Sequence, residues 1–210
     1  LLNGIFGTYG KRTFGEVKID GDVFVPGSPG EAIDKGIALL TNDRKETGLV
    51  LEMDIVQNAT LASLRKFSPA CWLRPREEAA AVAKRATSLR VKASSLNQLV
   101  CTLSGGNQQK VVMVKWIETN PKVLMLDEPT RGVDVGAKQE IYELMNEWTS
   151  QGIAIILITS EMSELLAMSD RIIVMHRGKI TAEFARETAT QEKILNAAMG
   201  EKDRDYVKIN

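Results

Sequence analysis

Leu103-Ser-Gly-Gly-Asn-Gln-Gln109 and Val123-Leu-Met-Leu-Asp-Glu-Pro-Thr130 are the two stretches that decide the fold of this chain. The first is a glycine-rich turn that opens a helix, so it combines a serine hydroxyl with unpaired backbone N–H groups and the positive end of a helix dipole. The second is an apolar run that ends in two adjacent carboxylates, which is typical of a buried strand with a polar end. We call them the signature segment (Leu103–Gln109) and the carboxylate strand (Val123–Thr130).

The signature segment has the chemistry of a phosphate site. Gly105 and Gly106 allow a close approach of the backbone, and the helix expected from Asn107 directs N–H groups at the same place. Ser104 is also a common type of helix N-cap, so a simple capped helix start is the alternative interpretation. The carboxylate strand, whose Asp127 follows Ser104 by 23 positions, favours the phosphate site, because its acids can hold the Mg²⁺ that accompanies a nucleotide.

The carboxylate strand offers two acids for two roles. Ligands bind at the carboxyl ends of the strands in open α/β sheets, which is where Asp127 and Glu128 are expected. One carboxylate can reach Mg²⁺ through water, and the next can orient an attacking water. Adjacent side chains of a strand point in opposite directions, so we expect the two acids to differ in role. A surface acidic turn is the alternative, and the four apolar residues before it argue against that interpretation.

No P-loop precedes these segments. That motif needs Gly, four residues, Gly-Lys and then Ser or Thr, placed between a strand and a helix. Gly10-Lys-Arg-Thr13 has arginine at the hydroxyl position, so an exposed loop is expected there. The chain also begins without methionine. We therefore expect a cloned or cleaved fragment that lacks its phosphate cradle.

The remaining pattern predicts an α/β fold with an inserted helical lobe. Strands are expected at 15–21 and 36–40, with a short helix between them that begins at the capping box Ser28–Glu31. From residue 49 to 104 apolar residues follow helical spacing, and Pro75 begins a helix. Strands at 123–126, 153–159 and 171–175 then alternate with helices at 136–150 and 161–168, which favours a mostly parallel sheet with helices on both faces. Lys179–Phe184 and a helix from about Thr188 complete the chain.

Composition excludes several classes of protein. The 210 residues carry 27 basic and 27 acidic side chains, so the net charge of zero gives no indication of a nucleic-acid partner. Cys71 and Cys101 are spaced for neither a metal site nor a disulfide framework, which favours a reducing compartment. The longest strongly apolar run, Ile153–Thr159, is too short to cross a bilayer.

Together the two segments resemble those of the ABC transporter ATPases, in which they are the signature loop and the Walker B strand. Arg131-Gly-Val-Asp-Val-Gly136 matches that family as well. Three features narrow the resemblance to one subfamily: Asn107 within the signature segment, Asn42-Asp-Arg-Lys-Glu-Thr-Gly-Leu49 and Thr159-Ser-Glu-Met-Ser-Glu-Leu165. They are similar to the C-terminal ATPase half of tandem ATP-binding proteins that serve ribose-, xylose- and galactose-type importers. The resemblance covers nearly the whole chain, and it does not identify the sugar.

The resemblance implies a P-loop NTPase-like fold whose P-loop strand and helix are largely missing. Residues 1–48 would be the N-terminal part of the core with a β-subdomain, and 49–104 the α-helical signature subdomain. Residues 105–200 would be the RecA-like core, and 201–210 a polar tail. Because the segment that is expected to be missing includes a central strand, apolar sheet is expected to be exposed.

The resemblance also implies the roles of individual residues. Ser104, Gly105, Gly106 and Asn107 would contact the γ-phosphate of ATP bound to the opposite ATPase half. Asp127 would serve Mg²⁺, Glu128 would be the catalytic base, and Gly132-Val-Asp134 would cross between the two halves. Asn42 stands where many members of the family have a glutamine, in a lid that faces the membrane subunit. That glutamine reaches Mg²⁺, and the asparagine side chain is shorter.

One departure from the family predicts an unequal pair of ATP sites. Ser160 stands where the family has its switch histidine, and a hydroxyl places no positive charge near the γ-phosphate. We therefore expect this half to donate its signature segment to a competent site while its own site is degenerate. His176, the single histidine, is expected to be an exposed turn residue.

Three classes of function remain open at this point. The favoured one is a peripheral subunit on the cytoplasmic side of the plasma membrane that energises import together with permease subunits and, indirectly, a periplasmic sugar-binding protein. A soluble ABC ATPase acting on ribosomes or DNA is the second, although basic surfaces and long heptads are missing. The third is a module for binding and dimerisation only, which is the expectation for the isolated 210 residues.

Overall fold

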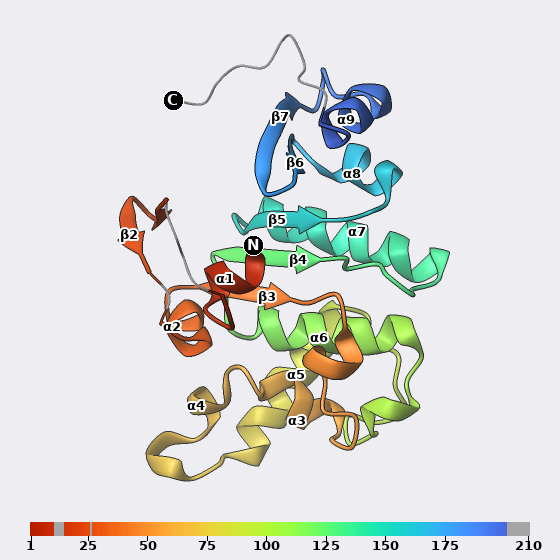
Figure 1. The fold of residues 1–210 in the computed structure, drawn as a ribbon. Coiled ribbons are helices and arrows are strands. Elements are labelled where there is room, and N and C mark those ends of the chain that lie inside the picture. The colour runs from red at the N-terminus through yellow and green to blue at the C-terminus, as the bar shows by residue number, and fades with distance from the viewer. Residues whose placement is uncertain (11–14, 26, 201–210) are drawn as a thin grey trace. The chain divides into compact units, whose positions relative to one another are not determined.

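The structure is a computed structural model that describes residues 1–10, 15–25 and 27–200 (Figure 1). The loop prediction for Gly10–Thr13 and the polar tail at 201–210 therefore rest on residues outside the described part. The chain forms two compact units, Leu1–Ile158 and Thr159–Asn210.

A three-stranded parallel sheet is the centre of the first unit. Its strands lie in the order β3 (Ile37–Leu40), β4 (Val123–Asp127) and β5 (Ala154–Ile158), and Figure 1 shows their arrows pointing the same way. Leu40 pairs with Leu126, so the residues that follow β3 and β4 leave the sheet at the same edge. The α/β fold with a parallel sheet is confirmed. Asp127 ends β4 at the carboxyl edge of the sheet, where it was expected.

Helices cover this sheet. α6 (Gly105–Ile117), α1 (Leu2–Phe6) and α2 (Pro29–Asp34) contact β3, and α7 (Val135–Ser150) contacts β5. The apolar face of α7 expected from the helical spacing is buried, at Ile141, Leu144, Met145 and Trp148. β5 is an edge strand of this sheet, and its Ile156 and Ile158 stay 43% and 39% exposed.

The N-terminal part of the first unit adds a hairpin. β1 (Val17–Ile19) pairs antiparallel with β2 (Asp22–Phe24), a partner that the sequence pattern did not predict. The turn between them has positive φ at Asp20 and Gly21, which suits a right-twisted two-residue hairpin. The cap predicted at Ser28 is confirmed, because its Oγ accepts a hydrogen bond from the Glu31 amide at 3.3 Å.

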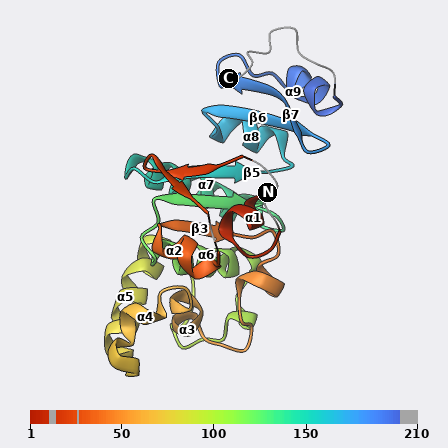
Figure 2. The ribbon, with the colours of Figure 1, turned by 60° about the vertical axis from the view of Figure 1, so that its left-hand side comes forward.

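The expected helical lobe consists of α3 (Ile55–Thr60), α4 (Leu64–Phe67) and α5 (Pro75–Ser88), with short turns η2 (Pro69–Cys71) and η3 (Val100–Thr102). Figure 2 shows this lobe extending from the sheet on the side of α6, against which α3 and α5 pack. A buried acid fixes the lobe: Glu118, just after α6, pairs with Lys66 and with Arg85 Nε at 3.2 Å.

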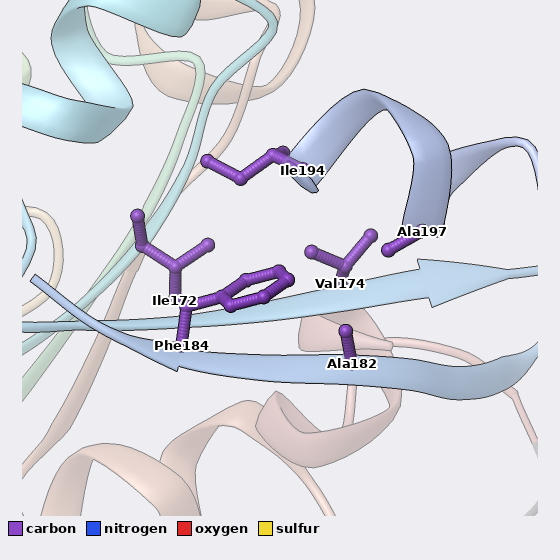
Figure 3. Close-up of a cluster of buried hydrophobic side chains, with 6 residues drawn as sticks. All are labelled: Ile172, Val174, Ala182, Phe184, Ile194 and Ala197. Atoms are coloured by element: carbon purple, nitrogen blue, oxygen red, sulfur yellow. The ribbon is translucent and has the colours of Figure 1, made fainter. Parts of the chain in front are cut away.

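The second unit has its own small core, shown in Figure 3. It consists of α8 (Met162–Met168), β6 (Arg171–His176), β7 (Lys179–Ala185) and α9 (Gln191–Ala198). Its buried side chains are Ile172, Val174, Ala182, Phe184, Ile194 and Ala197. β6 pairs antiparallel with β7 through a tight turn in which Arg177 and Gly178 adopt positive φ. The two strands form a sheet separate from β3–β5.

Two details of the second unit differ from the sequence predictions. α9 begins after Thr190 and not near Thr188, since the Thr190 hydroxyl accepts from the Lys193 amide at 3.3 Å. His176 is the last residue of β6 and not an exposed turn residue, because its Nδ1 is hydrogen-bonded to Ala198 O at 2.8 Å. None of the described helices combines the length and the hydrophobicity of a membrane span.

Candidate functional site

The signature segment forms the start of α6, with Ser104 as its N-cap. Ser104 is exposed, and its Oγ accepts hydrogen bonds from the Asn107 amide at 3.4 Å and from Asn107 Nδ2 at 3.0 Å. Because two donors occupy the hydroxyl oxygen, the Ser104 O–H is left to donate. The capped helix start is confirmed, and the phosphate site stays a prediction, for which Ser104 offers a donor beside the first amides of the helix.

Asn107 holds the Ser104 hydroxyl against the helical lobe. Its Oδ1 accepts from the Lys92 amide at 2.8 Å, while its Nδ2 donates to Ser104. The amide group is thus engaged on both sides within the chain. A phosphate contact by Asn107 stays a prediction, and in this structure the side chain orients the serine.

The two glycines of the signature segment lie against other parts of the chain, and packing requires Gly106 more strictly than Gly105. A Cβ on Gly106 would lie 2.8 Å from the Cβ of Ala137 in α7. A Cβ on Gly105 would lie 2.8 Å from Arg44 Nη2 and 3.2 Å from Gly132 O. Real Cβ atoms do not approach another Cβ at 2.8 Å, so Gly106 lets α6 start against α7. A Cβ at Gly105 would displace the flexible end of Arg44 and press on the loop that follows the carboxylate strand.

Several predicted site residues line one pocket of about 250 Å³. Ser104, Gly106, Asn107 and Asp134 meet there, and the remaining lining residues are Lys92, Lys110, Gly136, Ala137 and Glu140. Asp134 is the N-cap of α7, since its Oδ1 accepts from the Ala137 amide at 3.0 Å. The starts of α6 and α7 therefore face one pocket, and the structure brings the signature segment and Asp134 together.

A buried ion pair forms one side of this pocket. Lys110 Nζ pairs with the Glu140 carboxylate and donates to Arg90 O at 3.0 Å. The hydrogen bond from Lys110 lowers the pKa of Glu140, which favours the ionised carboxylate. Sequence reasoning missed it, although a lysine at 110 beside the apolar run 111–114 was an available signal.

Asp127 ends β4, and Glu128 leaves the strand. Glu128 has a φ of 52°, a left-handed conformation that is costly for a residue with a side chain and recurs at functional sites. Its N–H donates to Ile158 O at 2.8 Å, which holds it beside β5. The direction of Glu128 is therefore set by this turn and not by the alternation along a strand that the sequence suggested. Burial, and next the neighbouring Glu128 charge, raise the pKa of Asp127.

Asn42 and Asp127 lie at the same edge of the sheet, because β3 and β4 are parallel neighbours. Asn42 is exposed, two positions beyond the end of β3. A divalent cation would stabilise the Asp127 carboxylate, whose pKa is raised first by burial and then by the Glu128 charge, and Mg²⁺ binding by Asp127 and Asn42 stays a prediction. In the part of the chain that is described, His, Cys, Asp and Glu side chains form no group of three or more that could hold a metal.

Arg44 and Gln109 hold the loop that follows the carboxylate strand. Arg44 Nη1 donates to Arg131 O at 2.9 Å and its Nη2 to Gly132 O at 3.4 Å, while Gln109 Nε2 donates to Pro129 O at 2.7 Å. Sequence reasoning assigned no role to Arg44. Its charge within the short polar stretch 41–48 was the only local signal.

Ser160, the residue expected at the switch position, belongs to the second unit. It is exposed in the bend before α8, next to Thr159, whose Oγ1 accepts from the Glu161 amide at 3.0 Å.

Gly106→Ala is expected to destabilise the first unit by about 1–3 kcal/mol, because the new methyl group overpacks the contact between α6 and α7. Ala137→Gly removes the opposing methyl group, so the double variant should recover about 1–2 kcal/mol of coupling energy in a double-mutant cycle of urea unfolding. Gly136→Ala is the matched control, since its Cβ would meet Asp134 Oδ1 at an ordinary 3.4 Å. Strict additivity of the two substitutions would contradict the packing role.

Comparisons with known proteins show the family of this chain. The family profile described as "ABC transporter" matches residues 1–131. A xylose import ATP-binding protein of Geobacillus kaustophilus is 50% identical over 208 residues, covering 96% of this chain and 40% of that protein. A ribose import ATP-binding protein of Caldanaerobacter subterraneus subsp. tengcongensis is 49% identical over 197 residues, covering 93% and 40%. The chain thus spans about 40% of the length of the curated relatives that it matches.

Solved structures show the same fold. An ATP-binding cassette in a dimeric post-hydrolysis state bound to ADP and Pi superposes with a TM-score of 0.74 at 22% identity, covering 88% of this chain and 78% of that chain. A nucleotide-free ATP-binding cassette from an ABC transporter gives a TM-score of 0.71 at 23% identity, covering 94% and 78%. At this identity the likeness establishes the fold alone.

Proposed function

The chain belongs to the ABC transporter family, and on this premise we propose that it is the C-terminal ATPase half of the ATP-binding protein of a monosaccharide importer. The names of its relatives, xylose and ribose import ATP-binding proteins, support the substrate class. In this role it would lie at the cytoplasmic face of the membrane, contact permease subunits, and respond indirectly to a periplasmic sugar-binding protein. ATP and Mg²⁺ are its proposed ligands.

The proposal rests on one observation: the Ser104 hydroxyl accepts two hydrogen bonds, so its own O–H is available to donate. Asn107 supplies both donors to Ser104 Oγ, which leaves an exposed O–H at the start of the 13-residue helix α6. A donor hydroxyl beside unpaired amides and the positive helix end suits a phosphate oxygen. We propose that this phosphate is the γ-phosphate of ATP held by the opposite ATPase half.

The remaining site residues receive the following proposed roles. Gly105 and Gly106 allow the signature turn to form, Asn107 orients Ser104, and Asp134 fixes the start of α7 beside it. Asp127 and Asn42 would hold Mg²⁺, which would offset charge on the phosphates, and Glu128 would orient the attacking water. Ser160 at the switch position favours a degenerate site on this half. The four-part division into residues 1–48, 49–104, 105–200 and 201–210 stays part of this proposal.

Sugar-dependent ATP hydrolysis tests the proposed function. The complete protein, assembled with its permease in proteoliposomes, is expected to hydrolyse ATP faster when the binding protein is loaded with ribose, xylose or galactose. Stimulation by one of these sugars supports the proposal and identifies the substrate. Stimulation by ribosomes or DNA, with none by sugars, would replace it with the soluble ABC ATPase alternative.

Titration of the 210-residue chain with Mg-ATP addresses the binding-module alternative. A P-loop supplies many of the contacts to the phosphates, so the isolated chain is expected to bind Mg-ATP weakly by isothermal titration. A longer version that includes a P-loop should bind far more tightly. Tight binding by the 210 residues themselves would show that they contain another phosphate cradle.

A further inference from the structure

The π-helical turn η1 (Arg44–Gly48) is attached to the same helix that begins at the signature segment. Gly48 O accepts a hydrogen bond from Lys115 Nζ of α6 at 2.6 Å. A Cβ on Gly48 would lie 3.2 Å from Val112 Cγ2, so the turn packs tightly on α6. Asp43 caps the turn, because its Oδ1 accepts from the amides of Lys45 and Glu46, each at 3.0 Å. The C-terminal end of η1 is therefore fixed on α6 at Gly48, while the side chain of its first residue, Arg44, makes contacts outside η1.

Arg44, that first residue, joins η1 to the loop after the carboxylate strand. Its two terminal nitrogens donate to the consecutive carbonyls of Arg131 and Gly132, which are 87 and 88 positions away in sequence. The planar guanidinium fork suits two neighbouring acceptors in a way that a lysine ammonium does not. The same nitrogen, Nη2, occupies the space that a Cβ at Gly105 would need. Arg44 thus connects its own segment to the loop after the carboxylate strand, and it lies beside the signature turn.

The loop offers Arg44 two exposed carbonyl groups as acceptors. Arg131 and Gly132 are exposed, and Gly132 has a φ of 66°. Arg44 Nε is buried and lacks a partner within the described part of the chain. An unpaired buried N–H is costly, so the hydrogen bonds to Arg131 O and Gly132 O are the ones that hold the guanidinium in this arrangement.

We infer that Arg44 is a positioning residue that couples the lid segment (Asn42–Leu49) to the loop Arg131–Asp134. The inference rests on the proposed function, in which the lid faces the permease and the loop crosses to the other ATPase half. When the lid shifts, the loop must follow Arg44 or lose two hydrogen bonds. The lid position thereby sets the loop position, and Arg44 acts through the loop without touching the nucleotide.

The ratio of sugar-stimulated to basal ATP turnover tests this role in the complete transporter. Arg44→Gln and Arg44→Lys are both expected to lower that ratio at least about fivefold, since neither side chain provides the fork. Lys193→Gln is the control, because Lys193 is exposed on α9, outside the lid, the signature segment and the loop, and it should keep the ratio. Wild-type stimulation together with an unchanged ratio in both Arg44 variants would overturn the inference.

Hydrogen exchange separates this inference from the proposed function. Asp43→Ala removes the cap of η1, so in the complete protein it should speed amide exchange at 131–134 when Arg44 is present. In an Arg44→Gln background the same substitution should leave exchange at 131–134 unchanged. Equal acceleration in both backgrounds would overturn the coupling, whatever the sugar assay shows. An absence of sugar stimulation in the wild type would count against the proposed importer alone.

Discussion

Ser104→Arg is expected to lower ATP turnover of the complete transporter about 10²–10³-fold, the loss typical of removing one oriented donor from a charged transition state. The arginine removes the free O–H and fills the exposed space where the phosphate of the partner half is proposed to lie. Glu128→Gln should cost far less, because Ser160 already leaves the site on this half without its switch histidine. Steady-state hydrolysis measures both variants.

Controls separate this effect from folding. Ser104→Arg also removes an N-cap, worth about 1 kcal/mol. Ser104→Asp keeps an acceptor for the Asn107 amide while it places a negative charge toward the phosphate, so it should stay folded and lose turnover. Ser150→Arg, at an exposed serine at the end of α7, should leave turnover unchanged. Equal losses for the Ser104 variants and Glu128→Gln would refute the asymmetry of the two sites.

Lys115 is expected to make the stability of the chain depend on pH. Burial lowers its pKa from 10.5 to about 8, although its ammonium lies 4.9 Å from the centre of the Trp116 ring, a contact that favours the charged form. Between these pH values the unfolded chain binds more protons than the folded chain. The free energy of unfolding should therefore rise with pH across this window, by up to about 3 kcal/mol.

Comparison with Lys115→Met isolates this contribution. Below about pH 8 the wild type carries the full cost of a buried ammonium, and above pH 10.5 the cost is gone, while the neutral amine can still donate to Gly48 O. Urea unfolding should show that the wild type gains stability relative to Lys115→Met as pH rises. Lys84→Met, at an exposed position of α5, should run parallel to the wild type. A constant difference between wild type and Lys115→Met would contradict the buried-charge account.

Local sequence patterns were sufficient for most elements of the first unit. The 3.6-residue period of Ile141, Leu144 and Trp148 predicted the buried face of α7, and Ser28 marked the start of α2. Both signals act between residues three to seven positions apart, so they are present in the sequence itself. The Arg177-Gly178 turn between β6 and β7 is a local signal as well, but the separation of these two strands from the β3–β5 sheet was not predictable from the alternation of strands and helices.

The candidate site also combines features that the sequence predicts with features that depend on tertiary packing. The sequence by itself determined the signature segment, the carboxylate strand and the family, because hydroxyl, glycines and acids at fixed spacing are chemistry that a linear pattern can carry. Only the tertiary structure decided that Gly106 faces Ala137, that Glu128 turns out of its strand, and that Arg44 holds Arg131 and Gly132. Such contacts join distant parts of the chain, and they exist only once the packing of α6, α7 and η1 around the sheet has brought those parts together.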